Sequence, residues 1–199
     1  MRLGVFGGTF DPPHLGHLIL AEAARDQLQL DKVLWVIAGQ SPLKQDRILT
    51  PAPIRVAMVQ AAIADNLAFA LSRIDLDRPA PHYTVDTLKL LGAEFLNAEL
   101  YFLMGKDSLR DLPRWKNPVE IIRLATLVVS QRPGAAMDLS EIELAVPGVS
   151  QRVCWLNAPQ LEIASSDIQE RAREGRTVRY MLPQAVEEIV RREGLYKNG

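Results

Sequence analysis

Short runs of apolar residues recur along this chain, and more polar segments with apolar residues at helical spacing separate them. The apolar runs predict six strands, at 3–6, 32–38, 68–74, 100–104, 126–130 and 153–156. The segments between and after them predict helices at 14–28, 51–66, 84–95, 118–125, 165–174 and 183–192. Thr50 is expected to cap the second helix, with Pro51 as its first residue. Loops are expected at 39–49, 75–82 and 131–151, and turns within 105–115.

The near-continuous apolar character of the strands indicates the type of sheet. Strands that are apolar on both faces belong to parallel sheets that helices cover on both sides. The alternation of strand and helix therefore predicts an α/β fold, with one open, doubly wound parallel sheet. We expect a single domain over 1–199, with a C-terminal helical part at about 165–199. Ligands bind beyond the carboxyl ends of the strands in such sheets, so the functional site is expected at that edge.

The segment between the first predicted strand and the first predicted helix contains the main candidate site. Gly7 and Gly8 have no Cβ, so a nucleotide can lie close to the backbone there. The start of the helix provides unpaired N–H groups and the positive end of the helix dipole, and both favour anions. His14 and His17 lie three residues apart and should project from one face of the first helical turn. Together these features predict a phosphate-binding site.

Simpler interpretations of the same residues remain open. A Gly-Gly pair after a strand is often only a tight turn, and two histidines can be ordinary surface residues. A His-x-x-His pair can also bind a metal ion, but the third histidine, His82, stands alone and no cysteine cluster accompanies the pair. We therefore expect no metal ligands from side chains.

Charge and cysteine content restrict the partners and the compartment. The formal net charge is −1, so no overall positive field attracts nucleic acid or an anionic membrane. Cys154 is the only cysteine, which excludes an internal disulfide and fits a reducing compartment. No apolar run approaches the roughly 18 residues of a membrane span, and the N-terminus lacks the features of a secretory leader. We expect a cytoplasmic protein that binds neither nucleic acid nor membrane, and the sequence leaves room for a homo-oligomer.

Three further side chains follow predicted strands at their carboxyl ends. Lys44 lies in the polar loop after the second strand, where it can contact a substrate phosphate or be merely solvated. Asp107, in Gly105-Lys106-Asp107, follows the fourth strand; its carboxylate can accept hydrogen bonds from ribose hydroxyls, or the segment can be a plain turn. Trp115 can stack on an aromatic base or belong to the core.

Residues 7–17 match, at every fixed position, the GGTFDPxHxGH signature of the nucleotidyltransferase superfamily related to class I aminoacyl-tRNA synthetases. Three more elements resemble bacterial nicotinate-nucleotide adenylyltransferases: a GxD followed by Trp, a Tyr-Thr-x-x-Thr-Leu segment and a C-terminal Leu-Pro…Val…Ile…Leu-Tyr pattern. In this chain they are Gly105, Asp107 and Trp115; Tyr83, Thr84, Thr87 and Leu88; and Leu182, Pro183, Val186, Ile189, Leu195 and Tyr196. The resemblance covers essentially the whole chain. Phosphopantetheine adenylyltransferases share the first motif but are shorter and lack the Tyr-Thr and Trp elements.

The resemblance implies a Rossmann-like nucleotidyltransferase fold and a reaction of NAD biosynthesis. ATP and nicotinate mononucleotide would give deamido-NAD and pyrophosphate, with Mg²⁺ carried by ATP. The implied catalytic residues are His14 and His17, as donors to the phosphates. The implied ATP-binding residues are Gly7, Gly8, Thr9, Phe10, His17, Gly105, Asp107, Ser165, Ser166 and Arg173. The implied mononucleotide-binding residues are Asp11, Lys44, Tyr83, Thr84 and Trp115.

Two positions depart from the family pattern. The family's serine before Tyr-Thr is His82 here. Its late motif, Ile-Ser-x-Thr-x-Ile-Arg, ends in Gln169, so the arginine that would bind the triphosphate of ATP is absent. Arg173 lies one helical turn further over the same face and is predicted to supply this charge, whereas Arg171 should point elsewhere.

Other functions remain open from the sequence. The acceptor could be nicotinamide mononucleotide or another phosphorylated compound. A non-catalytic nucleotide-binding relative is favoured only by Gln169. A tRNA-binding relative of the synthetases would share the His-x-x-His geometry, but it should show a basic surface, which the net charge of −1 opposes.

Overall fold

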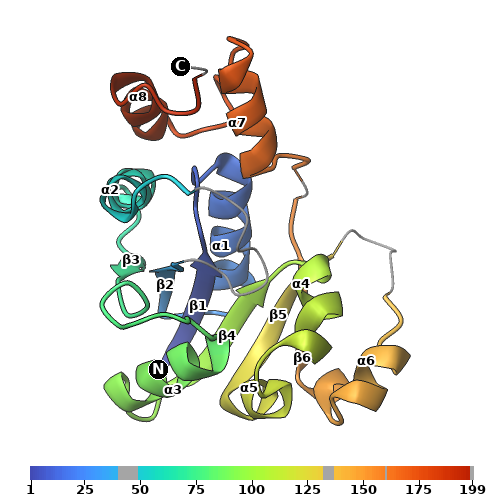
Figure 1. Ribbon diagram of the computed structural model, residues 1–199. Helices are drawn as coiled ribbons and strands as arrows, with labels where there is room; N and C mark the ends of the chain where they lie inside the picture. The colour runs from blue at the N-terminus through green and yellow to red at the C-terminus, as the bar shows by residue number, and fades with distance from the viewer. Residues whose placement is uncertain (40–48, 132–136, 160, 198–199) are drawn as a thin grey trace.

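A parallel β-sheet forms the centre of the protein in the computed structural model, which describes residues 1–39, 49–131, 137–159 and 161–197 (Figure 1). Within these residues the sheet has six strands in the order β3-β2-β1-β4-β5-β6, and every neighbouring pair is parallel. The strands are β1 Arg2–Gly8, β2 Lys32–Ile37, β3 Phe69–Ser72, β4 Glu99–Met104, β5 Ala125–Gln131 and β6 Val153–Asn157. The predicted parallel α/β fold is confirmed.

The strand order places a crevice between β1 and β4. From β1 the chain builds outward through β2 and β3, and from β4 it builds outward in the other direction through β5 and β6. The loops that leave β1 and β4 therefore diverge over opposite faces, and the space between them is where ligands bind in open α/β sheets. Gly8 and Met104 end these two strands, so the glycine loop and the Gly105 segment face each other across this crevice.

Helices cover both faces of the sheet (Figure 1). One face carries α1 Leu15–Gln27, α2 Ala52–Ile63, α7 Ser165–Arg173 and α8 Gln184–Arg192. The other face carries α3 Thr84–Glu94, α4 Lys106–Asp111, α5 Pro118–Leu124 and α6 Ser140–Ala145. Two short 3₁₀ turns, η1 Leu112–Arg114 and η2 Val149–Gln151, follow α4 and α6.

The strands are apolar throughout because each supplies side chains to two cores. In β2, Trp35 and Ile37 pack with α1 and α2, while the intervening Leu34 and Val36 pack with α3 on the opposite face. Residues of α7 and α8 belong to the same core as α1 and α2, so the C-terminal helices share the main core of the sheet. The single-domain assignment over 1–199 stays a prediction.

Three local predictions were wrong. The segment after β4 is not only a turn, because α4 begins at Lys106 and buries Leu109 completely. The expected loop 131–151 contains α6 and η2, which bury Ile142 and Val149 against the core. Such short helices have too few turns to show a clear hydrophobic period, and tertiary burial stabilises them.

The start of α2 also differs from the prediction. Pro51 occupies the N-cap position, and α2 begins at Ala52. The backbone of Thr50 is instead tied to other segments: its N–H donates to Asp11, and its carbonyl accepts from Arg55. Thr50 therefore connects α2 to the glycine loop.

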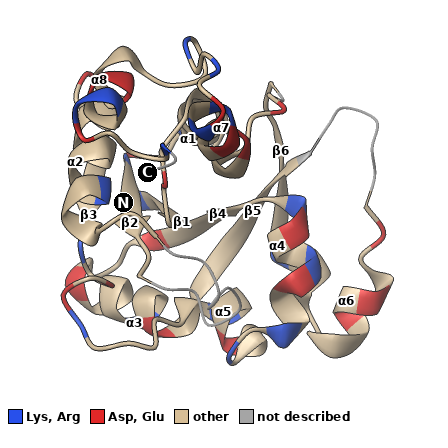
Figure 2. Cartoon of the chain, turned by 45° about the horizontal axis from the view of Figure 1, so that its top comes forward, with Lys and Arg blue, Asp and Glu red and all other residues tan. Residues whose placement is uncertain are grey.

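Charged side chains of both signs are mixed along the helices, and the strands carry few (Figure 2). In the part of the chain that the structure describes, no helix combines the length and the apolar character that a membrane crossing requires.

Candidate active site

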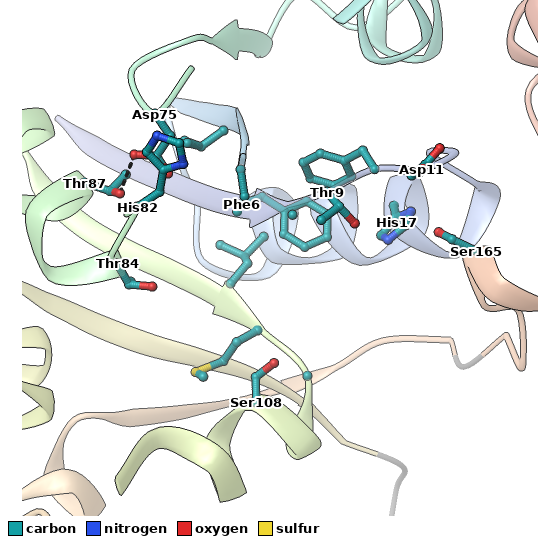
Figure 3. Close-up of a pocket in the computed structure, with 18 of the residues that line it drawn as sticks. Phe6, Thr9, Asp11, His17, Asp75, His82, Thr84, Thr87, Ser108 and Ser165 are labelled. Carbon is teal, nitrogen blue, oxygen red and sulfur yellow. Dashed lines mark hydrogen bonds between the residues drawn. The ribbon is translucent and has the colours of Figure 1, made fainter. Parts of the chain in front are cut away.

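A pocket of about 880 Å³ opens at the carboxyl edge of the sheet. Its walls come from the ends of β1, β2 and β4, the start of α3, the α4–η1 segment and the start of α7. Figure 3 shows two groups of polar side chains in it, separated by Phe6. One group contains Asp11, His17 and Ser165, and the other contains Asp75, His82 and Thr84. We call them the histidine end and the tyrosine end, after His17 and the neighbouring Tyr83.

The glycine loop is held by an aromatic anchor. Phe10 adopts a left-handed backbone conformation with φ of 48°, and the residue is 2% exposed. The ring lies about 5 Å from the rings of Phe6, His17 and Trp35, at centroid distances of 5.3, 5.2 and 5.0 Å. A Cβ on Gly8 would lie 3.0 Å from the Phe10 ring, a tight contact that the buried ring would have to shift to accept, so glycine is favoured there by the packing of the loop itself. Phe10 thus holds the glycine loop from the core, and it also lines the pocket as a largely buried residue.

Two buried charged side chains, Arg55 and Asp11, hold the glycine loop in place. Arg55 is 3% exposed; its guanidinium donates to the carbonyl oxygens of Thr9, Ala38 and Thr50 at 2.8–2.9 Å. Asp11, also 3% exposed, accepts from the Thr50 N–H at 3.0 Å and from the Tyr196 hydroxyl at 2.5 Å. Burial lowers the pKa of Arg55, and attraction to Asp11 opposes this change. The carboxylate of Asp11 therefore orders the loop, although this residue was predicted to bind the mononucleotide.

The C-terminal helices dock directly on the motif. The amide of Gln169 donates to the Asp11 carbonyl at 2.7 Å, and the Ser165 hydroxyl donates to the Pro12 carbonyl at 2.9 Å. These contacts give Gln169 a defined role in holding the loop at the position where the family pattern predicts arginine. Arg173, one turn further along α7, lines the pocket together with Ser165 and Ser166, whereas Arg171 is not among the pocket-lining residues of α7.

The two histidines of the motif lie together but are not equivalent. Their rings stack with centroids 3.6 Å apart. His14 is the N-cap of α1 and is 6% exposed, while the ring of His17 lines the pocket. His14 is not among the described residues that line the pocket, whereas His17 is, so the two rings do not project into the same space, contrary to the prediction. The backbone of His14 is extended, with φ of −136° and ψ of 170°, so the helical spacing that would place both rings on one face does not apply to it.

A backbone hydrogen bond sets the tautomer of His17. The N–H of His14 donates to Nδ1 of His17 at 3.1 Å, so the ring proton of neutral His17 is on Nε2. Burial lowers the pKa of His17 well below its usual value, and the proximity of His14 lowers it further. Burial also lowers the pKa of His14 to about 4, although Asp167 raises it. Both rings are therefore neutral at pH 7, and His17 can present a single oriented N–H donor.

The tyrosine end rests on a second polar network. The buried carboxylate of Asp75 accepts from Thr87 at 2.7 Å and pairs with Arg78 at 2.8 Å. Nε2 of His82 donates to the Arg78 carbonyl at 3.1 Å, and its ring fills the space that a Cβ on Gly39 would occupy. The network holds the loop before α3, and Tyr83, Thr84 and His82 line the pocket from that loop. His82, at the position where the family pattern predicts serine, is thus a structural part of this end.

Trp115 also lines the pocket, next to the tyrosine end. Its ring packs edge-on against Phe102 of β4, with centroids 6.1 Å apart. The adjacent Lys116 also lines the pocket, and its ammonium lies 4.2 Å from the centre of the Tyr83 ring. Lys116 was not singled out from the sequence; its position directly after Trp115 was the available signal.

Asp107 does not reach the pocket. Its side chain is 94% exposed and pairs with Arg110 at 3.3 Å, whereas Gly105, Ser108 and Asp111 line the pocket. Asp107 lies in the first turn of α4, and its carboxylate is directed to solvent, where it pairs with Arg110 of the same helix. The predicted contact between Asp107 and ribose therefore has no support in this arrangement. Ser108 and Asp111 were not singled out from the sequence, and helical spacing alone does not distinguish them from Asp107.

The remaining predicted residues divide into two sets. Gly7, Gly8 and Thr9 line the pocket at the end of β1, as expected. Lys44 lies outside the described residues. In the part of the chain that the structure describes, no three His, Cys, Asp or Glu side chains gather in a way that could hold a metal ion.

Comparisons with known proteins find relatives of this chain over nearly its whole length. A sequence model of the cytidylyltransferase-like family matches residues 5–171. A protein of Thermomicrobium roseum, named probable nicotinate-nucleotide adenylyltransferase, is 52% identical over 196 residues, covering 98% of this chain and 92% of its own. A protein of the same name from Thermus thermophilus is 43% identical, covering 99% of this chain and all of its own.

Solved structures show the same fold at low sequence identity. The nicotinic acid mononucleotide adenylyltransferase of Plasmodium falciparum, complexed with NaAD, superposes with a TM-score of 0.79 at 19% identity. The match covers 98% of this chain and 97% of that chain. The same enzyme complexed with APC gives a TM-score of 0.77.

Proposed function

Because the chain belongs to the cytidylyltransferase-like family, and within it to the nicotinate-nucleotide adenylyltransferases, we propose that it transfers the adenylyl group of ATP to nicotinate mononucleotide. The products are deamido-NAD and pyrophosphate, in a step of NAD biosynthesis. The structural observation that carries the proposal is one continuous pocket with a phosphate-binding loop at one end and aromatic side chains at the other. Its volume of about 880 Å³ is in the range of ligand sites that enclose molecules of this size.

The histidine end fits the reacting phosphates. A phosphate oxygen of the mononucleotide attacks the α-phosphorus of ATP, a new P–O bond forms, and the bond to pyrophosphate breaks. An ionised phosphate needs no general base, so positioning and charge stabilisation provide the catalysis. The Nε2–H of His17 is aimed into the pocket as a neutral donor, and it can stabilise negative charge that develops on the α-phosphoryl oxygens. His14 acts on this donor through its backbone N–H.

Arg173, Ser165 and Ser166 are proposed to bind the polyphosphate of ATP. All three line the pocket from α7, whose N-terminus carries the partial positive charge of the helix dipole. Gln169 is engaged with the Asp11 carbonyl, so the positive charge on this helix face comes from Arg173.

We propose that Mg²⁺ is bound together with ATP. Mg²⁺ usually keeps several waters and is held by substrate phosphates with only one or two carboxylates. The described part of the pocket fits this mode, because it presents scattered acids rather than a cluster of metal ligands. Bound there, the ion would neutralise charge on the departing pyrophosphate.

The tyrosine end is proposed to bind the pyridine ring. Trp115 can stack on the ring, with Tyr83 and Thr84 beside the ring carboxylate. Thr84 is the first residue of α3, so the first N–H groups of that helix are directed toward the same region.

The decisive experiment measures pyrophosphate release. The purified protein is mixed with ATP, Mg²⁺ and, in turn, nicotinate mononucleotide, nicotinamide mononucleotide and other phosphorylated acceptors. We expect release with nicotinate mononucleotide and formation of deamido-NAD, detected by chromatography. Binding of ATP without pyrophosphate release for any acceptor would instead indicate a non-catalytic nucleotide-binding protein. A cytoplasmic location stays a prediction that localisation of the tagged protein would test.

A further inference from the structure

We propose that the side chain of Lys116 provides the positive charge that selects an acidic pyridine ring over a neutral one. This inference rests on the proposed function and adds a specificity-determining residue to the tyrosine end of its site. The observation behind it is the position of the Lys116 ammonium at the pocket wall, directly after Trp115 and over the ring of Tyr83.

The ammonium is held in place from two sides. Its Nζ lies 4.2 Å from the centre of the Tyr83 ring, a distance at which the negative face of an aromatic ring attracts a cation. Asp86 of α3 lies on the other side, with its Oδ2 3.6 Å from Nζ. Both neighbours belong to the start of α3, so the charge is positioned by the same element that brings Thr84 to the pocket.

The ion pair between Lys116 and Asp86 leaves the ammonium available to a ligand. The two side chains are 46% and 37% exposed, and a half-exposed pair at 3.6 Å is a weak interaction that solvent screens. A pyridine ring stacked on Trp115 would place its carboxylate near the neighbouring ammonium and exclude water from it. The attraction to a ring carboxylate would then be stronger than the attraction to Asp86 in the open pocket.

The other cations in or near the described lining are less well placed than Lys116 to bind a ring carboxylate at the tyrosine end. Among the described residues that line the pocket, the cations are Arg114, Lys116 and Arg173. Arg173 belongs to α7 at the histidine end. Arg114 is 72% exposed and lies 3.7 Å from Asp111 of its own turn. Close to the lining, Arg78 is occupied by the buried Asp75. Lys116 is thus the cation of the described lining that lies against Tyr83.

Nicotinate mononucleotide and nicotinamide mononucleotide differ only in the substituent of the pyridine ring, a carboxylate in the first and a carboxamide in the second. Their ribose and phosphate are the same, so every contact there binds both equally. The ring carboxylate of the nicotinate form gains a charge-assisted interaction with an ammonium, whereas the carboxamide of the nicotinamide form does not. Removal of the ammonium should therefore lower the preference between the two substrates and leave the binding of ATP unchanged.

The test compares Lys116→Met with the wild-type protein. Methionine keeps an unbranched chain of similar length without the charge. We expect the ratio of kcat/KM for the nicotinate form to kcat/KM for the nicotinamide form to fall roughly tenfold. The KM for ATP should not change. Lys116→Arg keeps the charge and should retain most of the preference. Lys89→Met is the matched control, because Lys89 is 52% exposed on α3, pairs with Glu120 and lies outside the pocket lining.

Calorimetric titration with each mononucleotide alone separates this inference from the proposed function. Wild-type protein that binds the nicotinate form more tightly, and loses that preference in Lys116→Met, supports the role of Lys116 even if no pyrophosphate is released. An unchanged ratio in Lys116→Met, or equal weakening of both mononucleotides, would overturn it. Loss of the preference in Lys116→Arg would also overturn it, because side-chain shape would then matter and charge would not.

Discussion

The hydroxyl of Tyr196 donates a 2.5 Å hydrogen bond to Oδ1 of Asp11, across 185 positions of the chain. The carboxylate lies in the glycine loop, and the tyrosine follows the last helix. Burial raises the pKa of Tyr196, and the hydrogen bond to Asp11 raises it further, so the phenol stays a donor. With the contacts of Gln169 and Ser165, this bond makes the C-terminal segment part of the candidate active site.

Tyr196→Phe should destabilise the protein. The change leaves one oxygen of a buried carboxylate without its donor, which typically costs about 1–3 kcal/mol in the free energy of unfolding. Denaturant titration measures this loss. Tyr180→Phe is the control, because Tyr180 is 77% exposed and its variant should lie within about 0.5 kcal/mol of wild type. Equal stabilities for the Tyr196 variant and wild type would mean that Asp11 is satisfied by other groups.

His17→Ala should lower kcat far more than it weakens substrate binding. The ring donates to charge that develops in the transition state, and loss of one such donor typically costs about 10²–10³-fold in kcat. Steady-state kinetics of pyrophosphate release, with ATP and nicotinate mononucleotide varied separately, gives kcat and both KM values. A variant whose kcat stays within about twofold of wild type would remove His17 from the catalytic role.

Acidification should destabilise the folded protein through His14. Its pKa is about 4 in the folded state and near 6.5 when unfolded, so the unfolded chain binds more protons between these values. The contribution of neutral His14 to the free energy of unfolding is therefore complete above pH 6.5 and is lost as the pH falls toward 4. Integration over the two pKa values predicts a loss of about 2 kcal/mol between pH 7 and pH 5. The lowered pKa of His17 acts in the same direction.

Unfolding free energies at pH 7, 6 and 5 measure this dependence. In His14→Gln, where residue 14 no longer titrates, the slope should be clearly smaller. The range above pH 5 is chosen because it avoids most carboxylate titration. The same slope in the variant and in wild type would show that His14 is not held in its neutral form.

Arg173→Ala should raise the KM for ATP several-fold and leave the KM for the mononucleotide nearly unchanged. Arg173 lines the pocket on α7 at the face where Gln169 is occupied by the loop, so its charge is the one that can meet the polyphosphate. Arg171→Ala on the same helix is the control and should have little effect. The reverse pattern in the two variants would exclude Arg173 from ATP binding.

The sequence by itself determined the features that repeat locally. Trp35, Leu34 and their neighbours in β2 are all apolar because both faces of that strand are buried, and an unbroken apolar run of this kind predicts a parallel sheet. The helical register that placed Arg173 and Gln169 on one face follows from the same regularity, since a helix repeats every 3.6 residues. The motif from Gly7 to His17 is contiguous and could therefore be recognised directly.

Only the tertiary structure decided which distant residues meet. The exclusion of His14 from the pocket lining depends on its extended backbone before α1, and the pairing of Asp107 with Arg110 depends on α4, which is too short to show a period. The burial of Asp11 with Arg55 and Tyr196 joins three segments that no local pattern connects. Lys116 meets Tyr83 for the same reason, because the contact depends on how α3 packs against the segment after η1. Such pairings are set by the packing of whole elements, and packing leaves no repeat in the sequence from which the partner could be identified.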